Sequence, residues 1–201
     1  MDDRTQPARF YDPVMRGVHW ATLTLIMATY GLIWFAHSGL AGGASAAFVQ
    51  LHRSCGLTVA ALTIFRLVWR WRANIPALPA DLPLLQKIAA RITETVIYLL
   101  LLAQPLLGWL YTNFRGQRID LFLLGAIPPA FAADKTLAHL THELHELAGN
   151  VLLVVIGLHA AAALFHHVVR RDGVLLTMLP TRLHRASEYL RSPTRRGILR
   201  V

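Results

Sequence analysis

Histidines are the residues of this chain whose chemistry and spacing are most informative. The sequence contains ten, and five of them fall within or beside long apolar runs. An ionisable side chain at membrane depth is costly, so such a histidine is expected to have a partner or a ligand. Two imidazoles on facing helices can also bind one metal ion from opposite sides. The five histidines are His19, His52, His145, His159 and His166.

Four apolar runs, with their weakly polar flanks, approach the ~20 residues that a helix needs to cross a bilayer. Hydrophobic residues make up 55% of the 201-residue chain. We therefore predict an all-α integral membrane protein, a bundle of four transmembrane helices. A further apolar segment at 121–133 is short and contains Pro128 and Pro129, which favours an interfacial or re-entrant loop over a fifth span. The expected spans are approximately 13–37, 46–71, 88–112 and 136–170.

Capping residues indicate where the helices begin. Asp12 followed by Pro13 is typical of an N-cap followed by proline at the first helical position. Ser45 and Asp134 are expected to cap the second and fourth helices. We expect residues 1–180 to form one membrane domain and residues 181–201 to form a basic cytoplasmic tail.

The distribution of lysine and arginine predicts the orientation. Sixteen of the 20 basic residues lie in the amino-terminal segment, around the second connection or in the carboxyl-terminal tail, and four lie in the other two connections. The positive-inside rule then places both termini in the cytoplasm. Because the net charge of +9 flanks apolar spans, it indicates topology and contact with the lipid bilayer, and we expect no nucleic-acid partner.

This topology pairs four of the histidines by depth. His145 and His159 are fourteen residues apart, which puts them on one helix face about 21 Å from each other. The first helix enters from the cytoplasm and brings His19 to the level of His159. The second helix enters from outside and brings His52 to the level of His145.

Two neutral imidazoles at one depth suit axial ligation of haem iron. Copper or zinc is less suitable, because no Asp, Glu or Met accompanies either pair at membrane depth and four-coordinate zinc needs more ligands. No CxxCH motif is present, which argues against covalently attached haem. Gly56 and Gly149 each follow a paired histidine by four residues, and so leave room for a porphyrin edge or for close helix packing.

Several polar residues are candidates for secondary roles. His166 lies about 10 Å beyond His159 toward the cytoplasm, where it is either a catalytic donor to a quinone or an interfacial histidine. His139 and His142 are expected to face the headgroups. Basic residues near each level are candidates for pairing with haem propionates, or are ordinary flanking charges. The inner candidates are Arg16, Arg66 and Arg70, and the outer candidates are Arg53 and Arg115.

Four short stretches resemble the bacterial cytochrome b561 family, over about residues 10–180. They are HW at 19–20, LHRSCG at 51–56, YLLLLAQPLLGW at 98–109 and IGLHAAAALFHH at 156–167. The resemblance implies a four-helix bundle in the bacterial inner membrane that binds two b-type haems (protohaem IX). It implies His19 and His159 as ligands of the cytoplasmic haem, and His52 and His145 as ligands of the periplasmic haem.

The resemblance also implies electron transfer between the periplasmic face and the quinone pool. One class within the family, superoxide oxidase, passes the electron of superoxide to ubiquinone, and this is the activity that we expect. The first alternative is a haem b subunit that serves a separate dehydrogenase or hydrogenase. The second is a histidine-rich membrane metal transporter without redox activity. A homodimer is an open alternative to a monomer.

Overall fold

Four long helices make up most of the computed structural model, which describes residues 10–78, 82–122 and 124–179. Each helix is long and apolar enough to cross a membrane, so the predicted four-helix membrane bundle is confirmed. The expected tail at 181–201 lies outside the described residues. The helices are α1 (Pro13–His37), α2 (Ser45–Arg70), α3 (Leu84–Phe114) and α4 (Lys135–Phe165).

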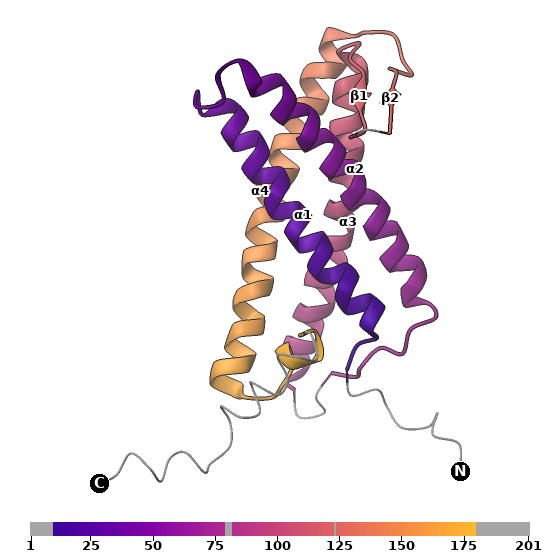
Figure 1. The fold of residues 1–201 in the computed structure, drawn as a ribbon. Helices are drawn as coiled ribbons and strands as arrows, with labels where there is room; N and C mark the ends of the chain where they lie inside the picture. The colour runs from indigo at the N-terminus through magenta and orange to yellow at the C-terminus, as the bar shows by residue number, and fades with distance from the viewer. Residues whose placement is uncertain (1–9, 79–81, 123, 180–201) are drawn as a thin grey trace.

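The helices form two antiparallel hairpins, with α1 packed on α2 and α3 packed on α4 (Figure 1). The start of α1 and the end of α4 lie at the same end of the bundle, which we call the inner end. The α1–α2 connection and the long connection from 115 to 134 lie at the opposite, outer end. This arrangement agrees with an even number of spans and with both ends of the bundle domain on one side.

Large apolar side chains cover the outward faces of the helices. Trp34 on α1 is 70% exposed, Leu99 on α3 is 63% exposed and Val154 on α4 is 62% exposed. Such a continuous apolar surface is unfavourable in water, whereas in a bilayer it is solvated by lipid. The faces therefore fit a protein surrounded by hydrocarbon.

The helix starts follow the capping prediction in two of three cases. The Asp12 carboxylate accepts from the Val14 N–H at 2.8 Å, and Asp134 accepts from the Leu137 N–H at 2.9 Å. The prediction for Ser45 is wrong. A 3-10 turn, η2 (Gly42–Ala44), leads directly into α2, so Ser45 already has helical backbone angles and its hydroxyl donates back to the Gly42 carbonyl at 2.9 Å.

The connection between α3 and α4 contains no long helix among its described residues. It forms a two-stranded antiparallel ribbon, with β1 (Ile119–Asp120) pairing Ile119 with Ile127 of β2 (Ala126–Ile127). The Asp134 N–H then donates to the Phe114 carbonyl at 2.9 Å, which closes the connection at the two helix ends. The segment is thus a cap on the outer end of the bundle, and not a fifth span.

Beyond α4 the chain turns back beneath the inner end. A π-helical turn, η3 (His166–Arg170), is followed by Arg171 in the left-handed conformation and by a 3-10 turn, η4 (Leu175–Thr177). The Thr177 carbonyl accepts from the Tyr11 N–H at 3.2 Å. The Met178 carbonyl accepts from the Trp20 indole at 2.9 Å. The returning segment is therefore fastened to the start of α1.

The orientation in the membrane gives a direct prediction. A reporter that is active only in the periplasm should be silent when fused after Val201 and active when inserted near Ala132, because sixteen basic residues flank the inner end or its tail and four flank the outer end. Reporter activity in cells expressing each fusion measures this. The opposite pattern would reverse the inner and outer ends.

Candidate functional site

The structure brings His52 of α2 and His145 of α4 together near the outer end. Their ring centroids are 6.2 Å apart, and the rings are nearly perpendicular, at 82°. Each Nδ1 donates to a backbone carbonyl, His52 to Thr29 at 2.8 Å and His145 to Gln104 at 3.0 Å. These two bonds fix the tautomer, so that Nε2 of each ring keeps its lone pair for a ligand.

An apolar layer separates this pair from the inner end. Each helix contributes one buried residue to the layer, and the four residues pack as one cluster. On α4 the residue is Leu152, seven positions from both His145 and His159, or about 10 Å from each along the helix axis. The layer therefore divides the bundle into an outer level and an inner level. Its members are Ile26, Val59, Leu101 and Leu152.

The inner level holds His19 of α1 and His159 of α4, on the inner-end side of the apolar layer. Nη1 of Arg66 donates to Nδ1 of His19 at 3.1 Å, and the Arg66 guanidinium lies 5.6 Å from the centroid of the Tyr98 ring. The indole of Trp20 contacts the edge of the His19 ring, with centroids 5.5 Å apart. The level thus combines two imidazoles with a partly buried cation.

Three buried donor atoms at the inner end have no hydrogen-bond partner among the residues that the structure describes. They are Nε of Arg16, Nε of Arg66 and the hydroxyl of Tyr98. Arg70, the third predicted basic residue here, is instead bound by the Glu94 carboxylate, at 2.5 Å from Nη1 and 3.4 Å from Nη2. Buried donors without acceptors are costly, and two of these are cationic, so they suit an anionic group.

The outer end carries a basic surface cavity of about 420 Å³ that is lined by Arg53, Arg115 and Arg118, together with Gln50 and Gln117. Nη2 of Arg53 donates to the Gln117 side chain at 2.6 Å. Nη1 of Arg115 donates to the Tyr111 hydroxyl at 2.9 Å. Arg53, one of the lining residues, directly follows His52 on α2, so the cavity lies at the same end of the bundle as the outer pair of histidines.

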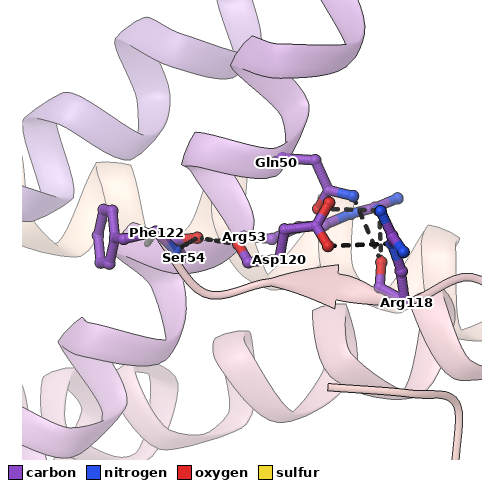
Figure 2. A network of polar contacts seen from close by, with 6 residues as sticks. All are labelled: Gln50, Arg53, Ser54, Arg118, Asp120 and Phe122. Atoms are coloured by element: carbon purple, nitrogen blue, oxygen red, sulfur yellow. Dashed lines mark hydrogen bonds and ion pairs between the residues drawn. The ribbon is translucent and has the colours of Figure 1, made fainter. Parts of the chain in front are cut away.

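Figure 2 shows how the ribbon of the α3–α4 connection is fastened beside this cavity. The Ser54 hydroxyl donates to the Asp120 carbonyl at 2.6 Å and accepts from the Phe122 N–H at 3.2 Å. Nε of Arg118 forms an ion pair with the Asp120 carboxylate at 3.0 Å. Ser54 is 1% exposed, so its two bonds hold the connection against α2 two residues from His52.

Gly56 and Gly149, the two glycines that follow paired histidines by four residues, have different surroundings. A Cβ at Gly56 would have no heavy atom within 4 Å apart from its own helical turn and chain neighbours, whereas a Cβ at Gly149 would lie 2.7 Å from Nε2 of Gln104. The Gly149 carbonyl also accepts from the Tyr30 hydroxyl at 2.5 Å. Sequence reasoning missed Gly108, where a Cβ would lie 3.0 Å from Cε1 of His145. Gly108 is therefore the position that lets α3 approach the His145 ring.

His166 lies in the π-helical turn at the inner end. Its Nδ1 donates to Oδ2 of Asp172 at 2.5 Å, and the two side chains are 16% and 8% exposed. Burial raises the pKa of the Asp172 carboxyl, but hydrogen bonds from His166 and from the Val174 N–H outweigh it and leave this pKa below its ordinary value. His139 and His142 lie elsewhere, paired with Glu143 and Glu146 on the outer part of α4.

Comparison with known proteins decides the family. The family model described as prokaryotic cytochrome b561 matches residues 10–181. The chain belongs to the prokaryotic cytochrome b561 family. "Cytochrome b561 homolog 1" of Escherichia coli (strain K12) is 30% identical over 171 residues, which cover 82% of this chain and 94% of the relative. "Probable superoxide oxidase CybB" of Yersinia pestis is 33% identical over 172 residues, which cover 85% of this chain and 96% of the relative.

As a member of this family, the chain is a bacterial multi-pass membrane protein of electron transfer that binds haem b. The outer level fits a haem closely. The ring centroids of His52 and His145 are 6.2 Å apart and Nε2 of each ring keeps its lone pair, so these two residues would hold the iron of a haem.

The inner level fits a haem by its chemistry. Two imidazoles are present, and the unpartnered donors of Arg16, Arg66 and Tyr98 match the carboxylates of a haem. The Arg66 bond to Nδ1 of His19 means that this nitrogen carries no proton. Ligation by a neutral His19 through Nε2 therefore requires the Arg66 guanidinium to exchange Nδ1 for another acceptor.

Proposed function

We propose that this cytochrome b561 family member is a superoxide:ubiquinone oxidoreductase of the bacterial inner membrane. The observation that carries the proposal is the pair His52 and His145, 6.2 Å apart, beside an arginine-lined cavity at the outer end. A relative that is 33% identical to this chain, and matches it over 96% of its own length, is named a probable superoxide oxidase. The proposal therefore combines a haem site near the outer surface, formed by the histidine pair, with a positively charged cavity that suits a small anion.

Two haems b would be held by the histidine pairs, with His52 and His145 at the outer level and His19 and His159 at the inner level. Haem, when bound, supplies a one-electron carrier at each level. Backbone carbonyls of Thr29 and Gln104 orient the outer imidazoles. At the inner level Arg16 and Arg66 would pair with propionates, whereas Arg70 is occupied by Glu94.

The outer cavity would collect the electron donor. Three guanidinium groups line it, and the Asp120 carboxylate pairs with one of them, so the cavity keeps an excess of positive charge. A field of this sign raises the encounter rate of an anion such as superoxide, and increasingly so at low ionic strength. Arg53 and Arg115 would act here by attracting the donor, which extends the propionate role considered from the sequence.

The reaction balances with two superoxide ions for each quinone. Each superoxide loses one electron and leaves as O₂, and ubiquinone takes up two electrons and two protons to become ubiquinol. His166 is proposed to donate a hydrogen bond and a proton to one quinone oxygen at the inner end. Histidine suits this role because its imidazole gains and loses a proton near neutral pH.

Stopped-flow absorption of the haems tests the first half of this reaction. Superoxide should reduce the purified protein rapidly, and the rate should fall as ionic strength rises. Arg115→Glu should slow reduction roughly 10-fold at low salt, because it replaces one of the cavity's cations with an anion. Arg72→Glu makes the same change of charge at an exposed inner-end position and should leave the rate unchanged.

Two results would contradict the proposal. Equal slowing by Arg115→Glu and Arg72→Glu would mean that the net charge matters and the outer cavity does not. Failure of superoxide to reduce the haems at all would favour the alternative of a haem b subunit that receives electrons from a separate dehydrogenase or hydrogenase.

A further inference from the structure

The closest polar contact of His166 comes from a residue just beyond the last membrane helix. Oδ2 of Asp172 lies 2.5 Å from Nδ1 of His166, and the Asp172 side chain is only 8% exposed. The same two residues are joined through the backbone, since the Asp172 N–H donates to the His166 carbonyl at 3.4 Å. A buried carboxylate in this position must accept the Nδ1 proton of the imidazole.

The local chain conformation is what brings Asp172 back to His166. Residues His166–Arg170 form a π-helical turn, a rare conformation that is found often at functional sites. Arg171 then adopts a left-handed conformation, with φ of 56°, which is unfavourable for a residue with a side chain. These two uncommon backbone conformations follow one another and reverse the direction of the chain. As a result, the Asp172 side chain reaches the His166 imidazole.

Asp172 also has an ordinary structural role, which must be separated from its contact with His166. Its Oδ1 accepts from the Val174 N–H at 3.1 Å, as aspartate commonly does in turns. Its Oδ2 lies 3.5 Å from Nε of Arg170. Oδ1 therefore stabilises the turn, whereas Oδ2 faces the His166 imidazole and the Arg170 guanidinium.

We propose that Asp172 is a positioning residue that holds His166 as the proton donor to the quinone. This inference rests on the proposed quinone role of His166. With Nδ1–H donated to Asp172, the imidazole can turn only Nε2 toward a ligand. When Nε2 is protonated as well, the carboxylate compensates the charge of the ring, and the Nε2 proton is the one available to a quinone oxygen.

The proton balance of this arrangement is closed. His166 gives its Nε2 proton to one quinone oxygen and is protonated again from water at the inner surface. The second quinone oxygen takes its proton from the same side. The two electrons come from two superoxide ions, and the Nδ1 proton stays between His166 and Asp172 throughout.

A double-mutant cycle tests the inference on the haem-loaded protein, with a short-chain ubiquinone added to the reduced form. His166→Ala should slow reoxidation strongly. Asp172→Asn should lower the maximal reoxidation rate roughly 10-fold or more, with a smaller change in KM for the quinone, because donor alignment matters most as charge develops on the oxygen. Adding Asp172→Asn to His166→Ala should have no further effect, since the residue acts through the imidazole.

Two controls separate positioning from turn formation. Val174→Pro removes the N–H bonded to Oδ1 at a φ of −52°, which proline adopts, and should leave reoxidation unchanged. Asp172→Ser keeps a turn acceptor but cannot reach the imidazole, and it replaces Asp172→Asn if that variant assembles poorly. Haem reduction by dithionite should be normal in every variant.

Three other outcomes would contradict the inference, and they differ in what they say about His166. If Asp172→Asn slows reoxidation equally with and without His166, the residue acts on the fold and the inference is wrong. If His166→Ala is slow but Asp172→Asn is normal, the inference fails while the quinone role of His166 stands. If His166→Ala itself reoxidises normally, the quinone binds elsewhere, and the proposed role of His166 fails together with the inference.

Discussion

Replacing either His52 or His145 with alanine should remove one of two haems and abolish rapid reduction by superoxide. Each imidazole supplies half of the axial ligation at the outer level, and the pair is already aligned by the carbonyls of Thr29 and Gln104. A single remaining imidazole leaves an iron with one protein ligand in a site shaped for two. The ratio of haem to protein, measured as the pyridine haemochrome, should fall from two to one.

The matched control for these variants is His139→Ala. His139 lies on the outer part of α4 like His145, but its side chain is 74% exposed and its Nδ1 lies 3.6 Å from Oε1 of Glu143. This variant should keep both haems. Loss of haem from His139→Ala, or an unchanged haem content in both His52→Ala and His145→Ala, would disprove the outer assignment. A single haem in the intact protein would disprove the two-level arrangement.

The four helices could be predicted from the sequence, and a pairing of histidines could be proposed from it, because both inferences depend on periodicity and length. Long apolar runs specify spans, and a separation of fourteen residues puts His145 and His159 on one face irrespective of the details of packing. Topology then determines which partner shares each depth. In the structure the rings of His52 and His145 lie 6.2 Å apart, and the role of both histidine pairs as haem ligands stays a prediction.

The contacts that surround the histidines were not accessible in this way, because they join segments far apart in the chain. The approach of Gly108 to the His145 ring and the bond from Arg66 to His19 depend on how the helices cross. Apolar periodicity indicates which residues are buried but does not determine which pairs meet. The only available signal for Gly108 was its place in a stretch that resembles the family.

Local backbone geometry accounts for the remaining differences. Ser45 has the residue type of an N-cap, but the 3-10 turn before it shifts the cap to Ala44. Asp172 resembles an ordinary turn residue in the sequence RRDG, and its contact with His166 depends on a π-helical turn that residue propensities do not indicate. Polar residues at helix ends therefore need the actual backbone before a role can be assigned.

Replacing His19 or His159 with alanine should remove the other haem and uncouple the two halves of the reaction. Superoxide should still reduce the remaining haem, because the outer pair and the basic cavity are intact. Reoxidation by quinone should fall to the background rate. The outer level lies about 21 Å from the inner level along α4, with an apolar layer between them, and electron transfer slows steeply with distance.

The two sets of variants should therefore give opposite kinetic defects from the same loss of one haem. Stopped-flow reduction by superoxide, followed by mixing with ubiquinone, measures both halves in one protein sample. A redox titration should show that a different transition is missing in each set. Rapid quinone reoxidation of His19→Ala and His159→Ala would put the quinone near the outer level. Because His166 and Asp172 lie at the inner end, that result would also rule out their proposed part in quinone reduction.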